Sequence, residues 1–319
     1  MHPNKKEAVL ITGASGFLGT YIAESYQRCG NPLLGIDRHS PKDATLWEKF
    51  HVGSCETASL EFFLKHFEVS TVFHLAGAAS VPDSVQAPFH DFESSVPGTV
   101  KLLSEVIRHR PSAHVIFISS AAVYGNPASL PIGEHAAVAP ISPYGIHKAI
   151  SELALEHYGR LYNLKVSILR VFSAFGPGLR KQLFWDLSRR AFEALARGEK
   201  SIVLQGTGRD SRDFIYASDV AKAALHIARR SMSPSFEVFN VGSGIGTSIR
   251  DAANQLIRHL DLDLDLVFDG VERSGVPHSW CADVTKLTKS GFRPDIPLSE
   301  GIESLAIWLK DDWRSSASK

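Results

Sequence analysis

The first half of the chain alternates short apolar runs with longer stretches in which apolar residues recur every three or four positions. The short runs, which are apolar almost throughout, are Ala8–Thr12, Pro32–Asp37, Thr71–Leu75, His114–Ser119 and Lys165–Val171. Strands that are buried on both faces of a parallel sheet have this continuous pattern, whereas half-exposed strands alternate. Because helical patterns lie between the runs, we predict an α/β fold with a doubly wound parallel sheet.

The pattern changes after the glycine-rich segment 176–178. Apolar spacing predicts a helix from about Gln182 to Arg197, with Gly198 as its C-terminal stop. Further elements are expected as helices near residues 217–230, 248–260 and 299–313 and as a short strand at 236–241. We therefore expect a first domain over residues 1–175 and a smaller C-terminal α/β lobe over residues 176–319, with segments near 213–245 returning to the first domain.

The composition excludes several classes of protein. The chain of 319 residues carries 34 Lys and Arg against 34 Asp and Glu. This balance gives no electrostatic footprint for general nucleic-acid binding or for an anionic membrane surface. No apolar run approaches the ~20 residues that span a bilayer, and the N-terminus lacks signal-peptide features, so we expect a cytoplasmic protein. Cys29, Cys55 and Cys281 have no metal or redox spacing, so we expect buried thiols and no metal site.

A glycine-rich segment follows the first predicted strand and opens the next helix. Gly13, Gly16 and Gly19 have the spacing GxxGxxG, which allows a tight turn, a close approach to a pyrophosphate and close packing of the helix. The N–H groups at the start of that helix favour an anion. Asp37 ends the second strand, where a carboxylate can accept hydrogen bonds from the adenosine ribose. Together these features predict dinucleotide binding. Asp37 favours NAD, and the neighbouring Arg38 leaves NADP open.

A tyrosine and a lysine four residues apart begin a later predicted helix. Tyr144 and Lys148 lie on one face of it. An ammonium near the phenol is expected to lower the pKa of the tyrosine, and the oxidised nicotinamide of a bound dinucleotide adds a second positive charge nearby, so that the tyrosine becomes a general base near neutral pH. Ser119 and Ser120 end the buried strand upstream, at the edge where ligands bind in an open α/β sheet. Tyr124 is a second phenol, but no lysine follows it at this spacing, so we expect a structural role.

The order of these motifs resembles that of a known family. The segments that carry the resemblance are GASGFLG at 13–19, Asp37, HLAG at 74–77, SSAAVYG at 119–125, YGIHK at 144–148, LRVFSAFGP at 169–177, RDFIY at 212–216 and NVG at 240–242. They are similar to those of extended short-chain dehydrogenases/reductases, specifically the NAD-dependent epimerases/dehydratases that act on nucleotide sugars. The resemblance implies a Rossmann domain, a C-terminal nucleotide-sugar lobe, tightly bound NAD and a homodimer built from two helices of each subunit.

The resemblance also implies roles for individual residues. Tyr144 would be the catalytic acid and base, Ser120 would hold the sugar O4, and Lys148 would bind the nicotinamide ribose and tune Tyr144. The implied cofactor contacts are Gly13, Ser15, Gly16, Phe17, Leu18, Gly19, Asp37, Arg38, Ser54, Cys55, Leu75, Ala76, Gly77, Ser95, Ser119, Tyr144, Lys148 and Val171. The implied substrate contacts are Ser80, Val81, Ser120, Ser173, Arg212 and Arg273. The two arginines suit a pyrophosphate, because guanidinium groups bind phosphate through two parallel hydrogen bonds.

The chain departs from the family pattern at four places. Ser54 and Cys55 stand where an aspartate usually meets the adenine, and Ser95 stands where an asparagine is common. Ser173 replaces a frequent asparagine, and Val276 replaces an aspartate near the second arginine. The last two departures concern contacts to the substrate rather than the core chemistry.

A comparison of two positions with those of the family's dehydratases narrows the choice of reaction. The 4,6-dehydratases of the family carry Asp-Glu just after the catalytic serine or threonine, where this chain has Ala121 and Ala122. Alanine has no proton to transfer, so the resemblance favours a 4-epimerase acting on a UDP-, dTDP- or GDP-linked sugar. Such an enzyme oxidises C4 transiently, lets the 4-keto sugar rotate and reduces it again. One alternative is an NAD(P)H-dependent reductase of nucleotide 4-keto-6-deoxysugars, which Arg38 supports. A 4,6-dehydratase and a non-catalytic dinucleotide-sensing protein have less support.

Overall fold

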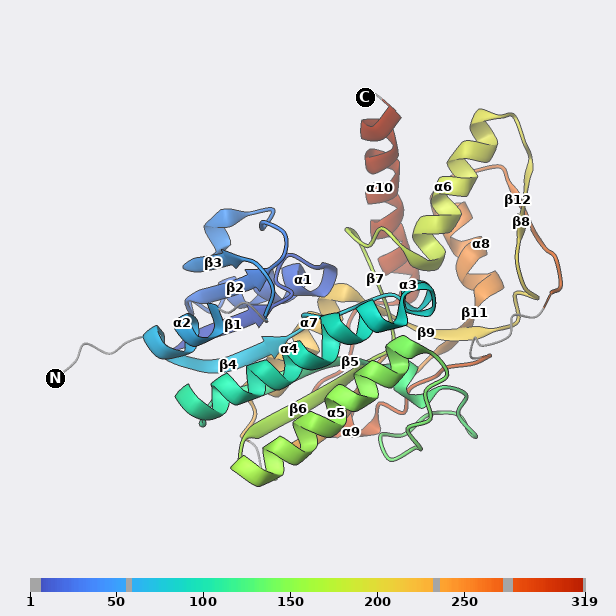
Figure 1. Ribbon diagram of the computed structural model, residues 1–319. Helices are drawn as coiled ribbons and strands as arrows, with labels where there is room; N and C mark the ends of the chain where they lie inside the picture. Colours follow the sequence, from blue (N-terminus) through green and yellow to red (C-terminus); the bar gives the residue numbers. More distant parts are fainter. Residues whose placement is uncertain (1–6, 56–58, 232–235, 272–277, 318–319) are drawn as a thin grey trace.

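A seven-stranded parallel sheet forms the centre of the larger part of the molecule (Figure 1). The computed structural model describes residues 7–55, 59–231, 236–271 and 278–317. The strands lie in the order β3-β2-β1-β4-β5-β6-β10. Their bounds are β1 (Ala8–Thr12), β2 (Leu33–Asp37), β3 (Lys49–Val52), β4 (Val69–His74), β5 (His114–Ser120), β6 (Lys165–Val171) and β10 (Phe236–Val241). The chain winds outward from β1 to β3 and then from β4 to β6, so the winding reverses between β1 and β4.

The carboxyl ends of the central strands meet along one edge of this sheet. Thr12 of β1 is in register with Ile36 of β2 and with His74 of β4. Ser120 of β5 is in register with Val171 of β6. In open α/β sheets, ligands bind outside this edge, at the point where the strand order reverses. The segments that follow these strands are therefore gathered around one crevice.

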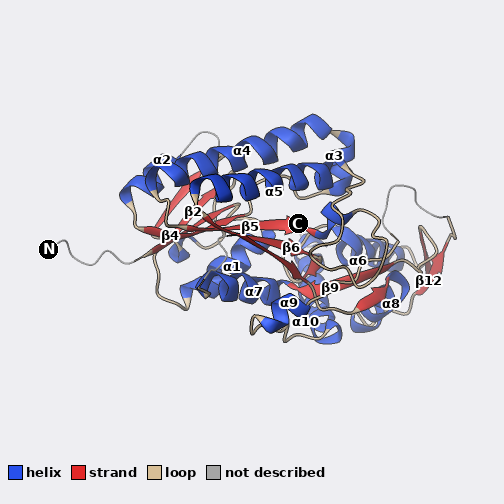
Figure 2. Cartoon of the chain, turned by 90° about the horizontal axis from the view of Figure 1, so that it is seen from below, coloured by secondary structure: helices blue, strands red, loops and turns tan. Residues whose placement is uncertain are grey.

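Helices cover both faces of the sheet (Figure 2). One layer consists of α2 (Ser59–His66), α4 (Pro88–His109) and α5 (Pro143–Tyr162), and the other contains α1 (Phe17–Gln27) and α7 (Ala217–Arg229). Leu10 of β1 belongs to the apolar cluster that contains Leu102 of α4, whereas its neighbour Val9 belongs to the cluster that contains Ile22 of α1. Because successive residues are buried on opposite faces, these strands are apolar throughout.

A smaller lobe is built from short strands and three helices. Its sheets consist of β7 (Ser173–Phe175), β9 (Ser211–Tyr216) and β11 (Gly246–Ser248), and of the parallel pair β8 (Ser201–Leu204) and β12 (Asp265–Phe268). Its helices are α6 (Gln182–Ala196), α8 (Ile249–His259) and α10 (Leu298–Ala317). Aromatic rings with centroids 5.1–6.1 Å apart fill its centre: Phe175, Phe184, Phe214 and Tyr216. Shorter elements elsewhere are η1 (Ala44–Leu46), α3 (Val81–Gln86), η2 (Ala121–Tyr124) and α9 (Thr285–Lys289).

The chain passes between the two parts more than once. After β6 it enters the small sheet as β7, and it returns when α7 packs against α1 and β10 pairs with β6. It then enters the small sheet again as β11, which pairs with β9. Elements that are neighbours in space are therefore far apart in the sequence.

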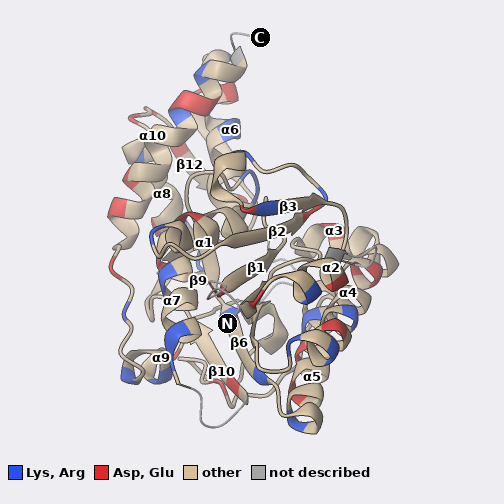
Figure 3. Cartoon of the chain, turned by 90° about the vertical axis from the view of Figure 1, so that its left-hand side faces the viewer, with Lys and Arg blue, Asp and Glu red and all other residues tan. Residues whose placement is uncertain are grey.

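Outside the sheet edge we looked for membrane-spanning helices, metal-binding clusters, charged surfaces and buried thiols. Within the described ranges, no helix is long and apolar enough to cross a membrane, and no three His, Cys, Asp or Glu side chains are arranged to hold a metal ion. Acidic and basic residues alternate along the elements on the side of the molecule seen in Figure 3. Cys55 is buried as expected. Cys29 and Cys281 are only partly buried, which corrects the expectation for these two, because both lie in connecting segments at the surface.

Leu305→Ala in α10 is expected to lower the free energy of unfolding by about 2–5 kcal/mol, because the removed side chain leaves a cavity in the small lobe. Leu305 is 2% exposed, whereas Ile307 on the same helix is 59% exposed. Ile307→Ala should therefore cost less than about 1 kcal/mol. Equilibrium unfolding in urea measures both values, and equal losses would contradict the packing of this helix.

Candidate functional site

One large cavity lies along the carboxyl edge of the large sheet and extends to the small lobe. Its volume is about 1430 Å³, which exceeds the roughly 300–1,000 Å³ of a pocket for one small ligand. The predicted site residues in its lining are Gly13, Ser15, Gly16, Phe17, Leu18, Gly19, Asp37, Arg38, Ser54, Cys55, Leu75, Ala76, Gly77, Ser80, Val81, Ser119, Ser120, Tyr144, Lys148, Val171, Ser173 and Arg212. Ser95 is not in this lining, and Arg273 and Val276 lie outside the described residues.

The glycine-rich loop is packed so closely that side chains cannot be accommodated. Gly13 has a φ of +71°, and a Cβ atom there would lie 2.8 Å from the backbone nitrogen of Ala76. A Cβ atom on Gly19 would lie 2.2 Å from the carbonyl oxygen of Gly13. The helix α1 starts directly after Gly16, which is its N-cap and has no side chain to accept from the first N–H groups. These donors therefore remain available to an anion in the cavity.

Asp37 is held at the rim of this loop. One carboxylate oxygen, Oδ2, accepts a hydrogen bond from the Ser15 nitrogen at 3.0 Å, and Oδ1 accepts one from the His39 nitrogen at 2.9 Å. The following residue, Arg38, is exposed. The carboxylate is thus fixed in orientation beside the loop, whereas the guanidinium is solvated.

The buried histidine of the HLAG segment, to which the sequence analysis gives no role, supports the opposite wall. His74 Nδ1 lies 2.7 Å from the Thr12 hydroxyl, and its Nε2 lies 3.0 Å from the Thr99 hydroxyl. Burial lowers the pKa of His74 to about 3, so the ring is neutral at physiological pH. The Ser95 hydroxyl accepts a hydrogen bond from the Ala78 nitrogen at 3.1 Å. Ser95 therefore holds the loop after β4 from behind instead of lining the cavity.

The predicted catalytic side chains converge where α5 begins. Ser142 caps this helix by accepting a hydrogen bond from the Gly145 nitrogen at 3.2 Å. The Ser120 hydroxyl lies near enough to the Tyr144 phenol for hydrogen bonding to lower the pKa of that phenol. Lys148 is buried, donates from Nζ to the Ile118 carbonyl at 3.0 Å, and lies 6.0 Å from the centre of the Tyr144 ring. Serine, phenol and ammonium thus stand together in one wall of the cavity.

The pKa of Tyr144 differs from the expectation. Burial raises it, the hydrogen bond with Ser120 lowers it, and the charge of Asp91 raises it further. The lowering expected from Lys148 is therefore outweighed within the protein itself, because the cost of burying a phenolate exceeds the stabilisation that the neighbouring protein groups provide. Burial also lowers the pKa of Lys148 to about 8, with Glu152 and Asp91 acting in the opposite direction.

A buried ion pair lies behind these side chains. Arg170 Nη2 donates to Glu152 Oε2 at 2.7 Å, and the Ser119 hydroxyl donates to Glu152 Oε1 at 2.5 Å. Arg170 also donates to the Tyr124 hydroxyl at 3.0 Å, and Tyr124 donates to Asn240 Oδ1 at 2.7 Å. The structural role expected for Tyr124 fits this network. The Ser119 hydroxyl is committed to Glu152, which leaves the next hydroxyl, on Ser120, to face a ligand.

The lining of the cavity contains a partly buried cation, Arg212. Arg212 donates to the carbonyl oxygens of Ser211 and His278, at 2.8 and 3.3 Å, and its guanidinium lies 5.5 Å from the Trp280 ring centre. Burial lowers its pKa, with Asp210 acting in the opposite direction. Among the described residues, no carboxylate lies within ion-pair distance of Arg212. An unpaired cation in a cavity is costly, which favours an anionic ligand.

The start of α6 is a part of the site that the motifs do not predict. Lys181 is the N-cap without a side-chain cap, and Gln182, the first helical residue, has a φ of +68°. Both line the cavity, and Lys181 Nζ donates to the Ala79 carbonyl next to Ser80. The start of α6 therefore belongs to the lining of the cavity, as Arg212 does. Two basic residues followed by a helical pattern are the signal in the sequence.

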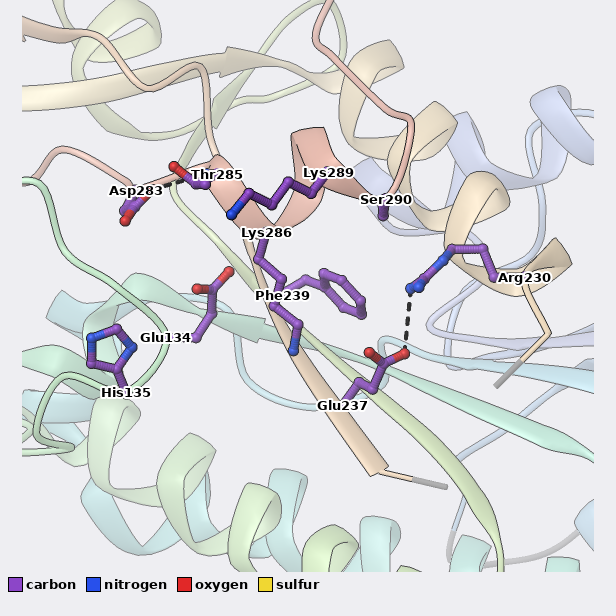
Figure 4. A pocket seen from close by; sticks show the side chains of 10 residues that line it. All are labelled: Glu134, His135, Arg230, Glu237, Phe239, Asp283, Thr285, Lys286, Lys289 and Ser290. Atoms are coloured by element: carbon purple, nitrogen blue, oxygen red, sulfur yellow. Dashed lines mark hydrogen bonds and ion pairs between the residues drawn. The ribbon is translucent and has the colours of Figure 1, made fainter. Parts of the chain in front are cut away.

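A second, smaller pocket of about 490 Å³ lies beside β10 and α9 (Figure 4). Lys286 donates to the Val238 carbonyl at 2.7 Å, and Glu134 accepts from the Asn240 nitrogen at 2.9 Å. These side chains satisfy backbone groups at the outer edge of β10, and Arg230 pairs with Glu237 at 3.3 Å. None of its lining residues belongs to the large cavity. The side chains around this pocket therefore cover the outer edge of β10, the last strand of the sheet.

Gly19→Ala is expected to abolish NAD binding, because the new methyl group forces the loop away from α1. The NAD content per chain, measured after denaturation of the purified protein, tests this. Gly246→Ala is the control, since its nearest neighbour would be 3.7 Å from the added Cβ. Wild-type NAD content in Gly19→Ala would contradict the packing of the loop.

The comparisons with known proteins agree with this geometry. The family model described as "NAD dependent epimerase/dehydratase family" matches residues 9–242. The UDP-glucose 4-epimerase of Mycolicibacterium smegmatis is 30% identical over 95% of this chain and 98% of its own. The structure of UDP-glucose 4-epimerase from Thermotoga maritima with UDP-glucose has a TM-score of 0.85 and is 28% identical, over 96% of this chain and 99% of its own.

MoeE5, solved with NAD and either UDP-glucose or UDP-glucuronic acid, also has a TM-score of 0.85 and is 28% identical, over 96% of this chain and 99% of its own. These findings confirm the predicted α/β Rossmann fold, the predicted cofactor and the predicted class of isomerase. With most of its length matched, the chain belongs to the NAD-dependent epimerase/dehydratase family.

Proposed function

We propose that this chain is an NAD-dependent 4-epimerase of a UDP-linked sugar. The observation that carries the proposal is the meeting of Ser120, Tyr144 and Lys148 in the cavity wall. Ala121 and Ala122, which are 0% and 6% exposed, occupy the positions where dehydratases of the family carry acids. Alanine has no proton to transfer, so the two groups that dehydration needs are missing at these positions, which favours epimerisation over dehydration.

The residues present fit NAD. The close-packed loop at Gly13 and Gly19 and the free N–H groups of α1 suit its diphosphate, and the carboxylate of Asp37 suits the adenosine ribose. The same carboxylate would repel the 2′-phosphate of NADP. When bound, NAD supplies an acceptor and then a donor of hydride at the sugar C4. Lys148 binds the nicotinamide ribose.

Tyr144 carries the proton transfer. Its phenol oxygen takes the proton of the sugar O4 and returns it after the 4-keto sugar has turned over in the cavity. Ser120 donates a hydrogen bond to the same sugar oxygen and keeps it within reach of the phenol. Because the proton is returned, the cycle needs no net proton source. The proposed triad of Ser120, Tyr144 and Lys148 therefore needs no carboxylic acid as a further member.

The nucleotide end of the substrate binds near the small lobe. Arg212 and the free N–H groups at Lys181 and Gln182 are the donors that we assign to its diphosphate. Ser80 and Ser173 border the sugar. UDP is the nucleotide that we propose, because the two structural neighbours described above were solved with UDP-sugars.

Tyr144→Phe is expected to lower kcat at least about 100-fold, since the proton-transferring group is removed while the NAD site is intact. The measurement is the C4 configuration of UDP-hexoses and UDP-hexuronates, followed by NMR with the purified, NAD-loaded enzyme. Tyr162→Phe, an exposed tyrosine of the same helix, is the control. No conversion of any sugar by wild type would refute the epimerase. Stoichiometric consumption of NADH would instead support the 4-ketoreductase.

A homodimer is a further part of this proposal. The outer face of α5 carries an apolar stripe at helical spacing, in which Ile146, Ile150, Leu153 and Leu161 are 38–75% exposed. A stripe of this kind on a polar surface indicates a partner. The two-fold packing of α4 and α5 against a second copy would cover it.

Leu153→Asp should therefore convert a dimer into a monomer, because it buries a charge in the interface. Sedimentation velocity measures the change. Val203→Asp in β8 is the matched control, since both side chains are 55% exposed. A monomeric wild-type protein, or an equal effect of both variants, would speak against this interface.

A further inference from the structure

Asp91 of α4 is a buried carboxylate that the proposed reaction does not use. It is 4% exposed, and its Oδ1 accepts a hydrogen bond from His147 Nδ1 at a distance of 2.5 Å. Its second oxygen, Oδ2, is buried and has no hydrogen-bond partner in the described part of the chain. A half-satisfied buried carboxylate is expensive, so its presence calls for a role.

The partner of this carboxylate lies inside the Tyr144–Lys148 motif. His147 is 12% exposed, follows Tyr144 by three residues and directly precedes Lys148 on α5. The ring of Phe92 on α4 meets the imidazole edge-on at 5.5 Å, and the Tyr144 nitrogen donates to the Ser84 hydroxyl of α3 at 3.1 Å. The Asp91–His147 contact therefore joins α4 to α5 at the helical turn that carries the phenol.

The negative charge of Asp91 acts on both members of the motif. It raises the pKa of Tyr144 and opposes the lowering of the pKa of Lys148 by burial. Glu152, one turn further along α5, acts on Lys148 as well. The acid of α3, Asp83, acts on Lys181 instead, and His90 and Glu93 of α4 line the cavity. The charge of Asp91 thus acts on the phenol of Tyr144 and on the ammonium of Lys148.

We propose that Asp91 and His147 form a positioning pair that sets the readiness of Tyr144 to give up its proton. The carboxylate favours the neutral phenol and the charged lysine. The imidazole N–H draws the negative charge of the carboxylate toward itself and weakens its effect on the phenol. The inference rests on the proposed function, because it gives Tyr144 the proton transfer.

The pH dependence of kcat/KM tests this pair in the NAD-loaded enzyme. Asp91→Asn removes the charge that opposes a phenolate, so the acid limb of the profile should move to lower pH by about one unit. His147→Phe keeps a ring of similar size but removes the donor to Asp91, so the acid limb should move to higher pH. In the double variant, His147→Phe should add no shift to that of Asp91→Asn, because the charge on which the imidazole acts has been removed. His66→Phe, at an exposed histidine of α2, is the control and should leave the profile unchanged.

A second measurement does not depend on turnover. Titration of tyrosinate by ultraviolet absorbance, taken as the difference between each protein and its Tyr144→Phe form, reports the phenol directly. It should shift in the same directions as the acid limb. If Asp91→Asn does not fold, Asp91→Ser, which is also neutral, carries the same expectation.

The outcomes separate this inference from the proposed function. If the variants lower kcat at every pH without moving either titration, or if their effects simply add, the contact only fastens α4 to α5 and the proposal is lost. If the wild-type protein epimerises no sugar while the tyrosinate titration shifts as expected, the reaction is wrong and the positioning pair stands.

Discussion

The buried ion pair between Glu152 and Arg170 is the constraint on which the site depends. It joins α5 to β6, and its other hydrogen bonds reach β5 through Ser119 and β10 through Tyr124 and Asn240. Both charges are removed from water, so the pair is stable only while nearly all of its donors and acceptors are satisfied, and loss of one partner costs about 3–5 kcal/mol. The consequence of the ion pair for the site is that it fixes the relative positions of α5, β5 and β6. The elements that carry the proposed triad cannot shift separately, and a serine, a phenol and an ammonium keep their relative positions without help from a ligand.

The fold follows from the sequence wherever burial is complete on both faces. The run Lys165–Val171 coincides with β6, and the other predicted runs differ from the strands by at most two residues at either end. Among the strands that were not predicted, β3 and β12 are only four residues long and their side chains are partly exposed, which removes the continuous apolar signal. The helices of the small lobe were predicted because each buries one stripe against the aromatic core.

The site could be predicted only as far as its chemistry lies within short segments. The glycine loop, Asp37 and Tyr144 belong to motifs of fixed spacing, so they were found. Asp91 and His147 were not, because 56 residues separate them and only the packing of two helices brings them together. The direction of the pKa shift of Tyr144 was missed for a related reason: spacing shows which charges are near but not how much water is excluded.

Because the two parts of the molecule interleave, neither can finish folding while the other is still being synthesised. β6 leaves the ribosome before β7, α6, β8 and β9, and only then does β10 arrive to pair with it. At roughly 5–20 residues per second the outer edge of β6 is left open for several seconds, and an open edge invites pairing with other chains. We therefore expect the two lobes to complete their folding together and not one after the other.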